Sequence, residues 1–286
     1  MANILIAGCG DIGSRLAEKF IELDHTVTAI RHRGTAFPKG AIGITQDLTT
    51  MTDDRLPEVD LVCLIMTPKG RTEEAYTKAY WRTAQRLVDR YAGHDKTPKV
   101  FFVSSTSVYG QNSGEELDEE SITLPQSATA KVLIEVERLL NEHFSSTSVR
   151  FSGIYGPGRL RLIESLAKSE PWKANQWTNR VHRDDCVNIM AFLAEKVFSG
   201  VRVEPVYIGT DCNPVSQWEV KLWLSNQLHV KPNLPDELGV ESFLPVSGKQ
   251  LSNARLLRLG YEFLYPSYLS GYRGLLEEHK ANVSYS

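Results

Sequence analysis

The sequence predicts an α/β fold in which helices cover both faces of a parallel sheet, the doubly wound arrangement. Three observations support this class. Strand and helix patterns alternate along residues 3–151, the strand predicted at 60–65 is nearly all apolar, and a glycine-rich turn follows the first strand. Apolar runs are typical of strands buried on both faces, and a strand–helix–strand alternation requires parallel pairing with right-handed crossovers.

The elements are expected in a regular order along the chain. Strands are predicted at 3–7, 26–30, 41–45, 60–65, 99–104, 147–151 and 205–208. Helices are predicted at 13–23, 72–91, 127–143, 160–168, 184–197 and 216–228, with Thr72 as the N-cap of the second. A polar loop rich in Ser, Gly and Glu is expected at 105–126.

The glycine-rich turn carries the strongest functional signal. Residues 8–13 are Gly-Cys-Gly-Asp-Ile-Gly, directly between the first strand and the first helix, which is the dinucleotide-binding fingerprint of a Rossmann-type domain. Gly8 allows the tight turn, Gly10 lets the backbone approach a pyrophosphate, and Gly13 lets the helix pack closely on the strand. The amides and dipole of the helix start favour a phosphate. The predicted cofactor-binding residues here are Gly8, Cys9, Gly10, Asp11, Ile12 and Gly13.

The character of the sequence changes after Ser152. Residues 153–183 are rich in Gly, Pro, Trp and Arg, and the strand–helix pattern returns after them. We therefore expect an NAD(P)-binding Rossmann domain at 1–152, with its sheet completed by parts of 180–210. A smaller α/β substrate-binding lobe is expected at 153–286.

Composition excludes several classes of partner. The 286 residues are 42% hydrophobic and 23% charged, with a formal net charge of −3. No basic surface is expected for nucleic acid, and no run approaches the roughly 20 apolar residues that span a bilayer. The four cysteines have neither disulfide nor metal-ligand spacing. We expect no nucleic acid, membrane or metal partner, reduced thiols, no signal peptide and a cytoplasmic location.

The end of the second strand predicts which dinucleotide is preferred. An NAD site usually has Asp or Glu about 20 residues after the glycines, where it holds the ribose 2′-OH. This chain has Arg31 and Arg33 there. A guanidinium pairs well with a 2′-phosphate. We predict NADP, held by Arg31 with help from Arg33. The alternative is a solvated Arg31 in a site that also takes NAD.

Two further strand ends are expected to face the dinucleotide. Asp47 and Leu48 follow the third strand, where an adenine ring would lie. Asp47 either accepts from the adenine amine or caps the strand end, and both interpretations stay open. Met66 and Thr67 follow the fourth strand, and their backbone is expected to face the cofactor.

Four segments together resemble a known family. They are Gly8–Gly13, Ser-Ser-Thr-Ser-Val-Tyr-Gly at 104–110, Arg-Phe-Ser-Gly-Ile-Tyr-Gly-Pro-Gly-Arg at 150–159, and Asn-Arg-Val-His-Arg-Asp-Asp at 179–185. This series resembles the extended short-chain dehydrogenase/reductase superfamily, in its NAD-dependent epimerase/dehydratase family. Residues 249–257 and 265–268 are most similar to the atypical YeeZ-like branch. The resemblance implies an NAD(P)-binding domain and a small-molecule substrate, often a nucleotide-sugar.

The resemblance also implies catalytic residues. Ser105 corresponds to the residue that binds the substrate hydroxyl or carbonyl, and Lys131 to the lysine of a Tyr-x-x-x-Lys pair. In that pair the lysine holds the nicotinamide ribose and lowers the pKa of the tyrosine. Here Ser127 stands at the tyrosine position. Its hydroxyl is a far weaker acid than a phenol, whose pKa is about 10, and its side chain is shorter.

Three accounts of the chemistry remain open. Tyr109 or Tyr155 supplies the proton, because both motifs are expected at the carboxyl ends of strands. Alternatively, Ser127 and Lys131 act as a modified pair in which Ser127 orients a water. In the third account redox catalysis is lost, and the protein binds a dinucleotide in a regulatory or scaffold role.

Arginines in two loops suggest an anionic substrate. Arg159 and Arg161 lie beside the Gly-Pro-Gly turn at 156–158, and Arg180 and Arg183 lie in the next loop. Guanidinium groups bind phosphates and carboxylates through paired hydrogen bonds. The alternative is that these arginines pair with acidic residues of the protein, such as Glu164 and Asp185.

Together these patterns predict an NAD(P)-dependent oxidoreductase or epimerase/dehydratase-like enzyme that acts on a small carbonyl or sugar-derived, anionic substrate. The alternative is an NADP-binding protein with little or no turnover, because Ser127 replaces the tyrosine. Helices 72–91 and 127–143 often form a dimer interface in the resembled family. Here the helix at 72–91 has many charged residues, which also fit a solvent-exposed face, so both a monomer and a homodimer remain possible predictions.

Overall fold

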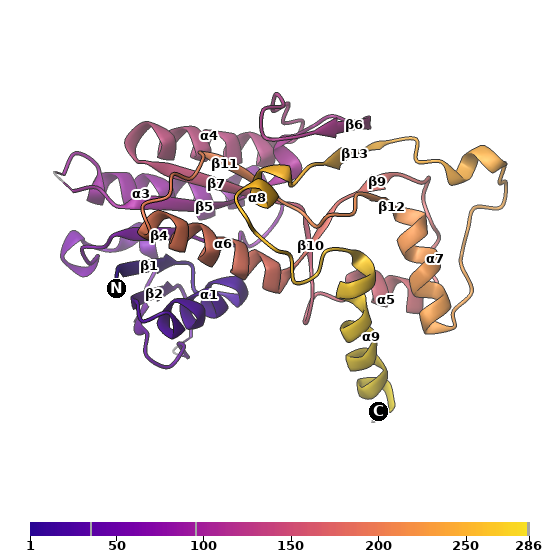
Figure 1. Cartoon of the computed structure of the whole chain (residues 1–286), viewed down its shortest axis with the longest axis horizontal. Coiled ribbons are helices and arrows are strands. Elements are labelled where there is room, and N and C mark those ends of the chain that lie inside the picture. Colours follow the sequence, from indigo (N-terminus) through magenta and orange to yellow (C-terminus); the bar gives the residue numbers. More distant parts are fainter. Residues whose placement is uncertain (35, 95, 285–286) are drawn as a thin grey trace. The chain divides into compact units, whose positions relative to one another are not determined.

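A computed structural model confirms the α/β class and describes residues 1–34, 36–94 and 96–284. Its central sheet has seven strands in the order β11-β7-β5-β4-β1-β2-β3 (Figure 1). Pairs β1–β2, β1–β4, β2–β3 and β4–β5 are parallel. The strands span Asn3–Ala7 (β1), Thr26–Arg31 (β2), Ile42–Thr45 (β3), Leu61–Leu64 (β4), Lys99–Ser105 (β5), Ser146–Phe151 (β7) and Val206–Gly209 (β11).

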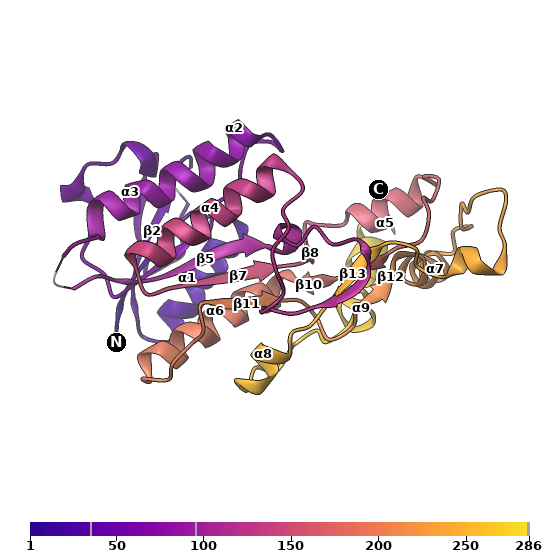
Figure 2. The same ribbon diagram turned by 90° about the horizontal axis from the view of Figure 1, so that it is seen from above.

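Helices cover both faces of this sheet, as a doubly wound fold requires (Figure 2). On one face lie α2 (Glu73–Tyr76), α3 (Arg82–Tyr91) and α4 (Ala128–His143). On the other face lie α1 (Asp11–Glu22) and α6 (Arg183–Phe198). Strands β1 and β4 are buried along almost their whole length, which accounts for their apolar sequences.

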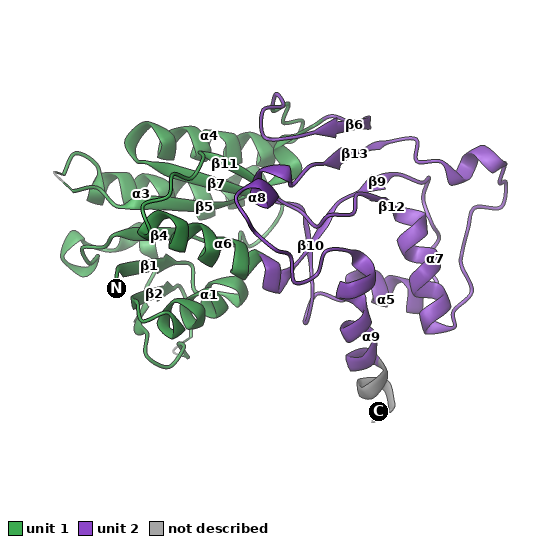
Figure 3. Cartoon of the chain, viewed as in Figure 1, with its two compact units in different colours: residues 1–110, 123–150, 186–207 green, residues 111–122, 151–185, 208–286 purple. Residues whose placement is uncertain are grey.

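The chain forms two compact units (Figure 3). The first comprises residues 1–110, 123–150 and 186–207, and the second comprises 111–122, 151–185 and 208–286. The division that the sequence predicts near residue 152 stays a prediction. Within the second unit the elements are β6 (Ser113–Leu117), β8 (Gly153–Tyr155), α5 (Arg161–Ala167), β9 (Trp177–Thr178), β10 (Arg180–His182), β12 (Val215–Ser216), α7 (Gln217–Leu228), β13 (Gly248–Leu251), α8 (Ala254–Arg258) and α9 (Tyr268–Ser284).

Three local predictions differ from the structure. Helix α1 begins at Asp11, two residues earlier than expected. The helix expected at 72–91 contains a five-residue π-helical turn at Thr77–Trp81, although Thr72 caps its start by accepting from the Ala75 amide at 3.2 Å. The predicted loop at 105–126 contains strand β6, which pairs in parallel with β13. Because the partner of β6 lies more than a hundred residues away in the sequence, its local pattern carries no signal for the strand.

A buried ion pair joins α4 to β7 within the first unit. Arg150 Nη2 lies 2.6 Å from Glu137 Oε2, and their side chains are only 7% and 9% exposed. Arg150 Nη1 donates to the Tyr109 hydroxyl at 2.7 Å, and the Ser104 hydroxyl donates to Glu137 Oε1 at 2.6 Å. Burial lowers the pKa of Arg150, but its bonds to Glu137 outweigh this and raise the pKa overall. The network therefore satisfies both buried charges.

Removing the carboxylate of this network should destabilise the fold. A Glu137→Gln variant leaves the Arg150 charge buried without a counter-charge, and we expect the free energy of unfolding to fall by about 3 kcal/mol. Urea denaturation measures this change. Glu135→Gln, on the exposed side of the same helix, is the matched control and should change stability little. Equal stability of the two variants would contradict the role of the ion pair.

Candidate functional site

The turn between β1 and α1 contains three glycines, and the structural reason for having glycine differs among the three positions. Gly8 has φ +110°, and a Cβ there would collide with the backbone oxygen of Ile65. A Cβ on Gly13 would collide with the carbonyl oxygen of Gly8. A Cβ on Gly10 would meet nothing within 4 Å. The described chain therefore needs glycine at 8 and 13 for its own packing, whereas the open space beside Gly10 fits a ligand that approaches the backbone.

The helix start behind this turn is suited to an anion. The Ser14 amide donates to Gly10 O at 2.8 Å as the first helical hydrogen bond, so the amides of Ile12 and Gly13 point out of the helix end. No side chain of Gly10 competes for these amides, and the helix dipole adds positive potential. The early start of α1 at Asp11 thus places the helix end directly at the glycine turn.

The end of β2 lies beside the turn. The amides of Gly8 and Cys9 both donate to Ile30 O, at 3.2 and 2.7 Å. The next residue, Arg31, donates from Nη1 to Ala36 O, and its guanidinium lies 5.6 Å from the centre of the Phe37 ring. Arg33 is exposed. The loop that follows β2 therefore holds the Arg31 guanidinium near the strand end.

The ends of β3 and β4 hold the other predicted cofactor residues. Asp47 Oδ1 accepts from the amide and hydroxyl of Thr49, at 3.0 and 2.7 Å, so Asp47 caps the short helix at Leu48–Thr50. Burial raises the pKa of Asp47, but the bonds from Thr49 and the nearby His32 lower it overall. Leu48 is buried. The capping interpretation of Asp47 has direct support, and adenine contact stays a prediction.

The segment after β4 runs beside the glycine turn. The Ile65 amide donates to Ala7 O at 2.8 Å, and the Met66 sulfur lies 3.2 Å from the position of a Cβ on Gly8. Thr67 follows with an exposed side chain. The structure thus places Met66 next to the turn, and a role of Thr67 in cofactor binding stays a prediction.

The residues that stand for the catalytic pair lie at the start of α4. Lys131 is exposed in the first turns of the helix. Ser127 is its N-cap, and its hydroxyl accepts from the Ala130 amide at 3.1 Å and lies 3.0 Å from the Thr129 hydroxyl. Ser105 likewise accepts from the Ser107 amide at 3.2 Å. Both serine hydroxyls therefore satisfy backbone amides near the start of a helix.

Neither tyrosine predicted as a proton donor is accessible in this conformation. Tyr109 has no exposed surface, and its hydroxyl accepts from Arg150. Tyr155 is buried in the core of the second unit, where its ring stacks on Tyr272 at 4.6 Å and meets the edge of His182. Burial raises the pKa of Tyr155 far above its usual value. Packing, which sequence motifs do not report, gives both phenols core positions.

The arginines of the second unit have unequal environments. Arg183 is buried, with Nε 3.0 Å from Asp184 Oδ1 and Nη1 donating to Pro157 O at 3.0 Å. Its guanidinium therefore binds groups of the protein itself. This matches the alternative interpretation, in which the arginine pairs with an acidic residue of the protein. Arg159 and Arg161 are exposed and remain candidates for binding an anion.

A buried aspartate in the second unit is absent from the sequence predictions. Asp211, on the loop after β11, is 1% exposed, and burial raises its pKa to about 7. Its Oδ1 accepts from the Asn213 amide at 3.1 Å, whereas Oδ2 has no hydrogen-bond partner among the described residues. An Asp followed by Cys, Asn and Pro looks like an ordinary turn, so the sequence gives no signal of this burial.

Two classes of site find no support within the described part of the chain. No group of three or more His, Cys, Asp or Glu side chains there could hold a metal ion. None of the described helices is both long and apolar enough to cross a membrane.

The fold and the glycine turn define a dinucleotide-binding protein of the Rossmann type. The model of the NAD dependent epimerase/dehydratase family matches residues 4–209, so the chain belongs to this family. The predicted family is therefore confirmed.

Individual relatives agree over the whole length. Protein YeeZ of Escherichia coli strain K12 is 26% identical over 94% of this chain and 98% of its own. A structure of a Methylobacillus flagellatus protein assigned to the NAD-dependent epimerases/dehydratases is 35% identical with a TM-score of 0.80, covering 98% and 99% of the two chains. UDP-glucuronic acid 4-epimerase of Bacillus cereus, in complex with UDP-glucuronic acid and NAD, is 19% identical with a TM-score of 0.77, covering 98% and 99%.

A side chain at Gly10 should weaken dinucleotide binding without harming the fold. In Gly10→Ala the new Cβ enters the open space beside the turn, and we expect affinity for NADP and NAD to fall at least about tenfold, or 1.4 kcal/mol. Calorimetric titration measures the affinity and thermal unfolding measures the fold. Gly274→Ala, also in open space but on α9, is the control. Unchanged affinity in Gly10→Ala would argue against this site.

Proposed function

We propose that the protein is an NADP-dependent oxidoreductase or epimerase/dehydratase-like enzyme, and that its substrate is a small carbonyl compound or sugar derivative that carries negative charge. The observation that carries this proposal is the β1–α1 turn, where Gly10 leaves open space in front of outward-pointing helix amides. Gly8 to Gly13, Arg31, Met66 and Thr67 would hold the dinucleotide, which supplies or accepts a hydride when bound. The cytoplasmic location and the oligomeric state stay predictions.

Arg31 supports NADP over NAD. Its guanidinium lies at the end of β2, one residue beyond Ile30, whose carbonyl binds the glycine turn. The acidic residue that NAD sites usually place here is absent from the strand end, where a carboxylate would repel a 2′-phosphate. Ala36 O and the Phe37 ring hold Arg31 near the strand end, so less side-chain entropy is lost when it binds a phosphate.

Arg159 and Arg161 support a negatively charged substrate. Both are exposed in the second unit, where Arg159 ends the motif at 150–159 that resembles the family and Arg161 follows it. The related Bacillus cereus epimerase binds UDP-glucuronic acid, which carries phosphates and a carboxylate. A substrate of this kind would use guanidinium groups for paired hydrogen bonds.

One observation favours a second candidate, a protein that binds NADP with little or no turnover. The Ser127 hydroxyl caps α4, so the position of the family tyrosine serves helix stability. Tyr109 and Tyr155, the other phenols considered, are buried. Lys131 alone holds a ribose but supplies no phenolic proton. The protein would then bind the dinucleotide but lack the acid that the reaction needs.

Restoring the tyrosine distinguishes the two candidates. Wild type, Ser127→Tyr and Ser127→Phe are mixed either with NADPH and a panel of small carbonyl compounds or with NADP and a panel of UDP-sugars. The change in cofactor redox state and the substrate products are followed. If the protein is an active enzyme with another proton donor, the wild type turns over substrate, and the Ser127→Tyr substitution changes the rate little. A binding protein shows no wild-type turnover and gains at least about a hundredfold over background in Ser127→Tyr, the lower end of the range of general acid catalysis. Ser127→Phe controls for loss of the N-cap. An inactive wild type contradicts the first candidate, and an active one contradicts the second.

Reversing the charge at Arg31 should reverse the cofactor preference. We expect Arg31→Asp to weaken NADP binding by about tenfold to a hundredfold, because a charge-assisted hydrogen bond contributes about 1.5–3 kcal/mol. NAD should then bind more tightly than NADP. Arg202→Asp, on an exposed loop of the same unit, is the control. The proposal is wrong if the unmodified protein already binds NAD as tightly as NADP.

A further inference from the structure

The first unit contains a cavity of about 210 Å³ between α4, β7 and the start of β11. Helix α4 lines it with four residues that are three or four positions apart and so share one stripe: Ile134, Glu137, Arg138 and Asn141. Strand β7 lines it with alternate residues, which share one face of the sheet: Ser146, Ser148 and Arg150. Because Arg150 on this face bonds to Glu137 on this stripe, the two sets of side chains point toward each other across the cavity.

Two serine hydroxyls on this face of β7 are available to a ligand. Ser146 and Ser148 are only 5% and 3% exposed, and neither hydroxyl has a hydrogen-bond partner among the described residues. Elsewhere, at Thr83 and Ser225, hydroxyls without a partner are fully enclosed, whereas those of Ser146 and Ser148 keep accessible surface on the cavity. A buried hydroxyl is costly unless it is hydrogen-bonded. The partner of these two groups therefore has to come from the cavity.

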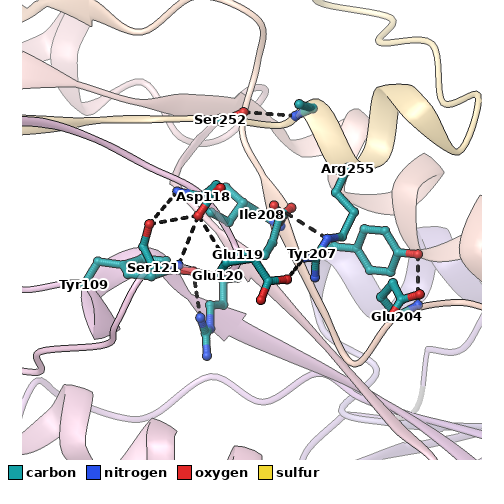
Figure 4. A network of polar contacts seen from close by, with 12 residues as sticks. Tyr109, Asp118, Glu119, Glu120, Ser121, Glu204, Tyr207, Ile208, Ser252 and Arg255 are labelled. Atoms are coloured by element: carbon teal, nitrogen blue, oxygen red, sulfur yellow. Dashed lines mark hydrogen bonds and ion pairs between the residues drawn. The ribbon is translucent and has the colours of Figure 1, made fainter.

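Hydrogen bonds fix the wall that residues 205–206 form (Figure 4). On one side of this wall the Glu204 amide donates to the Tyr207 hydroxyl at 3.0 Å. On the other side the Ile208 amide donates to the Glu119 carboxylate at 3.0 Å, which satisfies the edge strand β11 at that residue. The chain is thus held on both sides of the wall, and the cavity is a defined feature of the fold.

The charge on the cavity walls is positive. Both carboxylate oxygens of Glu137 accept from Arg150, and Oε1 also accepts from the Ser104 hydroxyl, so these two charges balance each other. Arg138 also lines the cavity, and it has no ion pair or side-chain hydrogen bond among the described residues. One positive charge is therefore left for a ligand.

A neighbouring hollow adds to this positive character. It has a volume of about 340 Å³, shares Asn141, Ser146 and Pro205 with the cavity, and is also lined by Lys99. Lys99 Nζ donates to the Ser145 hydroxyl at 3.0 Å. Burial lowers the pKa of Lys99, and no carboxylate acts on it to oppose this shift. The surroundings of the cavity therefore favour an anion over a cation.

The number of charges and the shape of the walls narrow the class of anion. A single guanidinium balances one negative charge and binds a carboxylate through two parallel hydrogen bonds. A phosphate carries up to two negative charges, which Arg138 alone does not balance. Ile134, Pro205 and Val206 give the cavity an apolar side that suits a short alkyl chain.

We propose that this cavity is a binding site for a small organic carboxylate. Arg138 pairs with the carboxylate, the hydroxyls of Ser146 and Ser148 donate to its oxygens, and the alkyl part lies against Ile134 and Val206. None of the residues predicted to hold the dinucleotide or the substrate lines this cavity. The site is therefore an addition to the proposed NADP-dependent function and does not depend on it.

The amide NMR signals of Ser146 and Ser148 report on occupancy of this cavity. With the full chain and no dinucleotide, we expect butyrate to shift both signals in a saturable way. Butyramide has nearly the same shape without the charge and should leave them unchanged, and inorganic phosphate should bind more weakly than butyrate. The proposal is overturned if butyrate shifts neither signal, if butyramide acts as butyrate does, or if phosphate binds more tightly.

Variants test which groups bind the carboxylate. We expect Arg138→Gln to raise the half-saturating butyrate concentration at least about tenfold, because it removes the charge-assisted hydrogen bonds. Arg82→Gln, at an exposed residue of α3 outside the cavity, is the matched control and should bind as wild type does. Unchanged butyrate binding in Arg138→Gln overturns the proposal.

Removing a serine hydroxyl separates binding from folding. We expect Ser148→Ala, followed by the Ser146 signal, to raise the half-saturating butyrate concentration several-fold. Its thermal unfolding temperature without ligand should stay that of wild type, because the hydroxyl makes no hydrogen bond within the described protein. A Ser148→Ala protein that unfolds at a lower temperature but binds butyrate normally overturns the proposal, since the hydroxyl would then serve the fold alone.

Discussion

The turn from β1 into α1 can close because neither Gly8 nor Gly13 has a side chain. A Cβ at either position would collide with backbone atoms, so the helix could not lie this close to the strand. The same closeness directs the first helix amides outward at the end of β1 and places the turn against Ile30 and Ile65. The ends of β2 and β4, and with them Arg31 and Met66, owe their position beside the turn to this packing.

A second constraint acts at the start of α4. A helix buried against the sheet needs its first amides satisfied, and Ser127 does this with its hydroxyl. A tyrosine at this position would not cap the helix in this way. The chain therefore has a well-capped helix with Lys131 in place, in a family whose usual chemistry needs the missing phenol. Residue 127 serves the stability of the helix, whereas the resemblance predicts a catalytic acid at this position.

The two units use buried charge differently. In the first, Glu137 and Arg150 satisfy each other with help from Ser104 and Tyr109, so the ion pair is complete within the protein. In the second, Asp211 is equally buried but keeps one oxygen without a partner among the described residues. The charge of Arg180 compensates part of the cost of burying Asp211, so this carboxylate is only partly balanced within the second unit.

The sequence by itself determined the fold class, the glycine turn, most helix and strand positions and the family, because these depend on local periodicity and on residues close together along the chain. It also located Ser127 and Arg31. Only the tertiary structure decided that Tyr109 and Tyr155 are core residues, that Arg183 is paired with Asp184, that β6 exists and that Asp211 is buried. Apart from the pairing of Arg183 with its neighbour Asp184, each of these depends on contacts between segments far apart in sequence, and local patterns carry no information about which distant segment will cover a side chain.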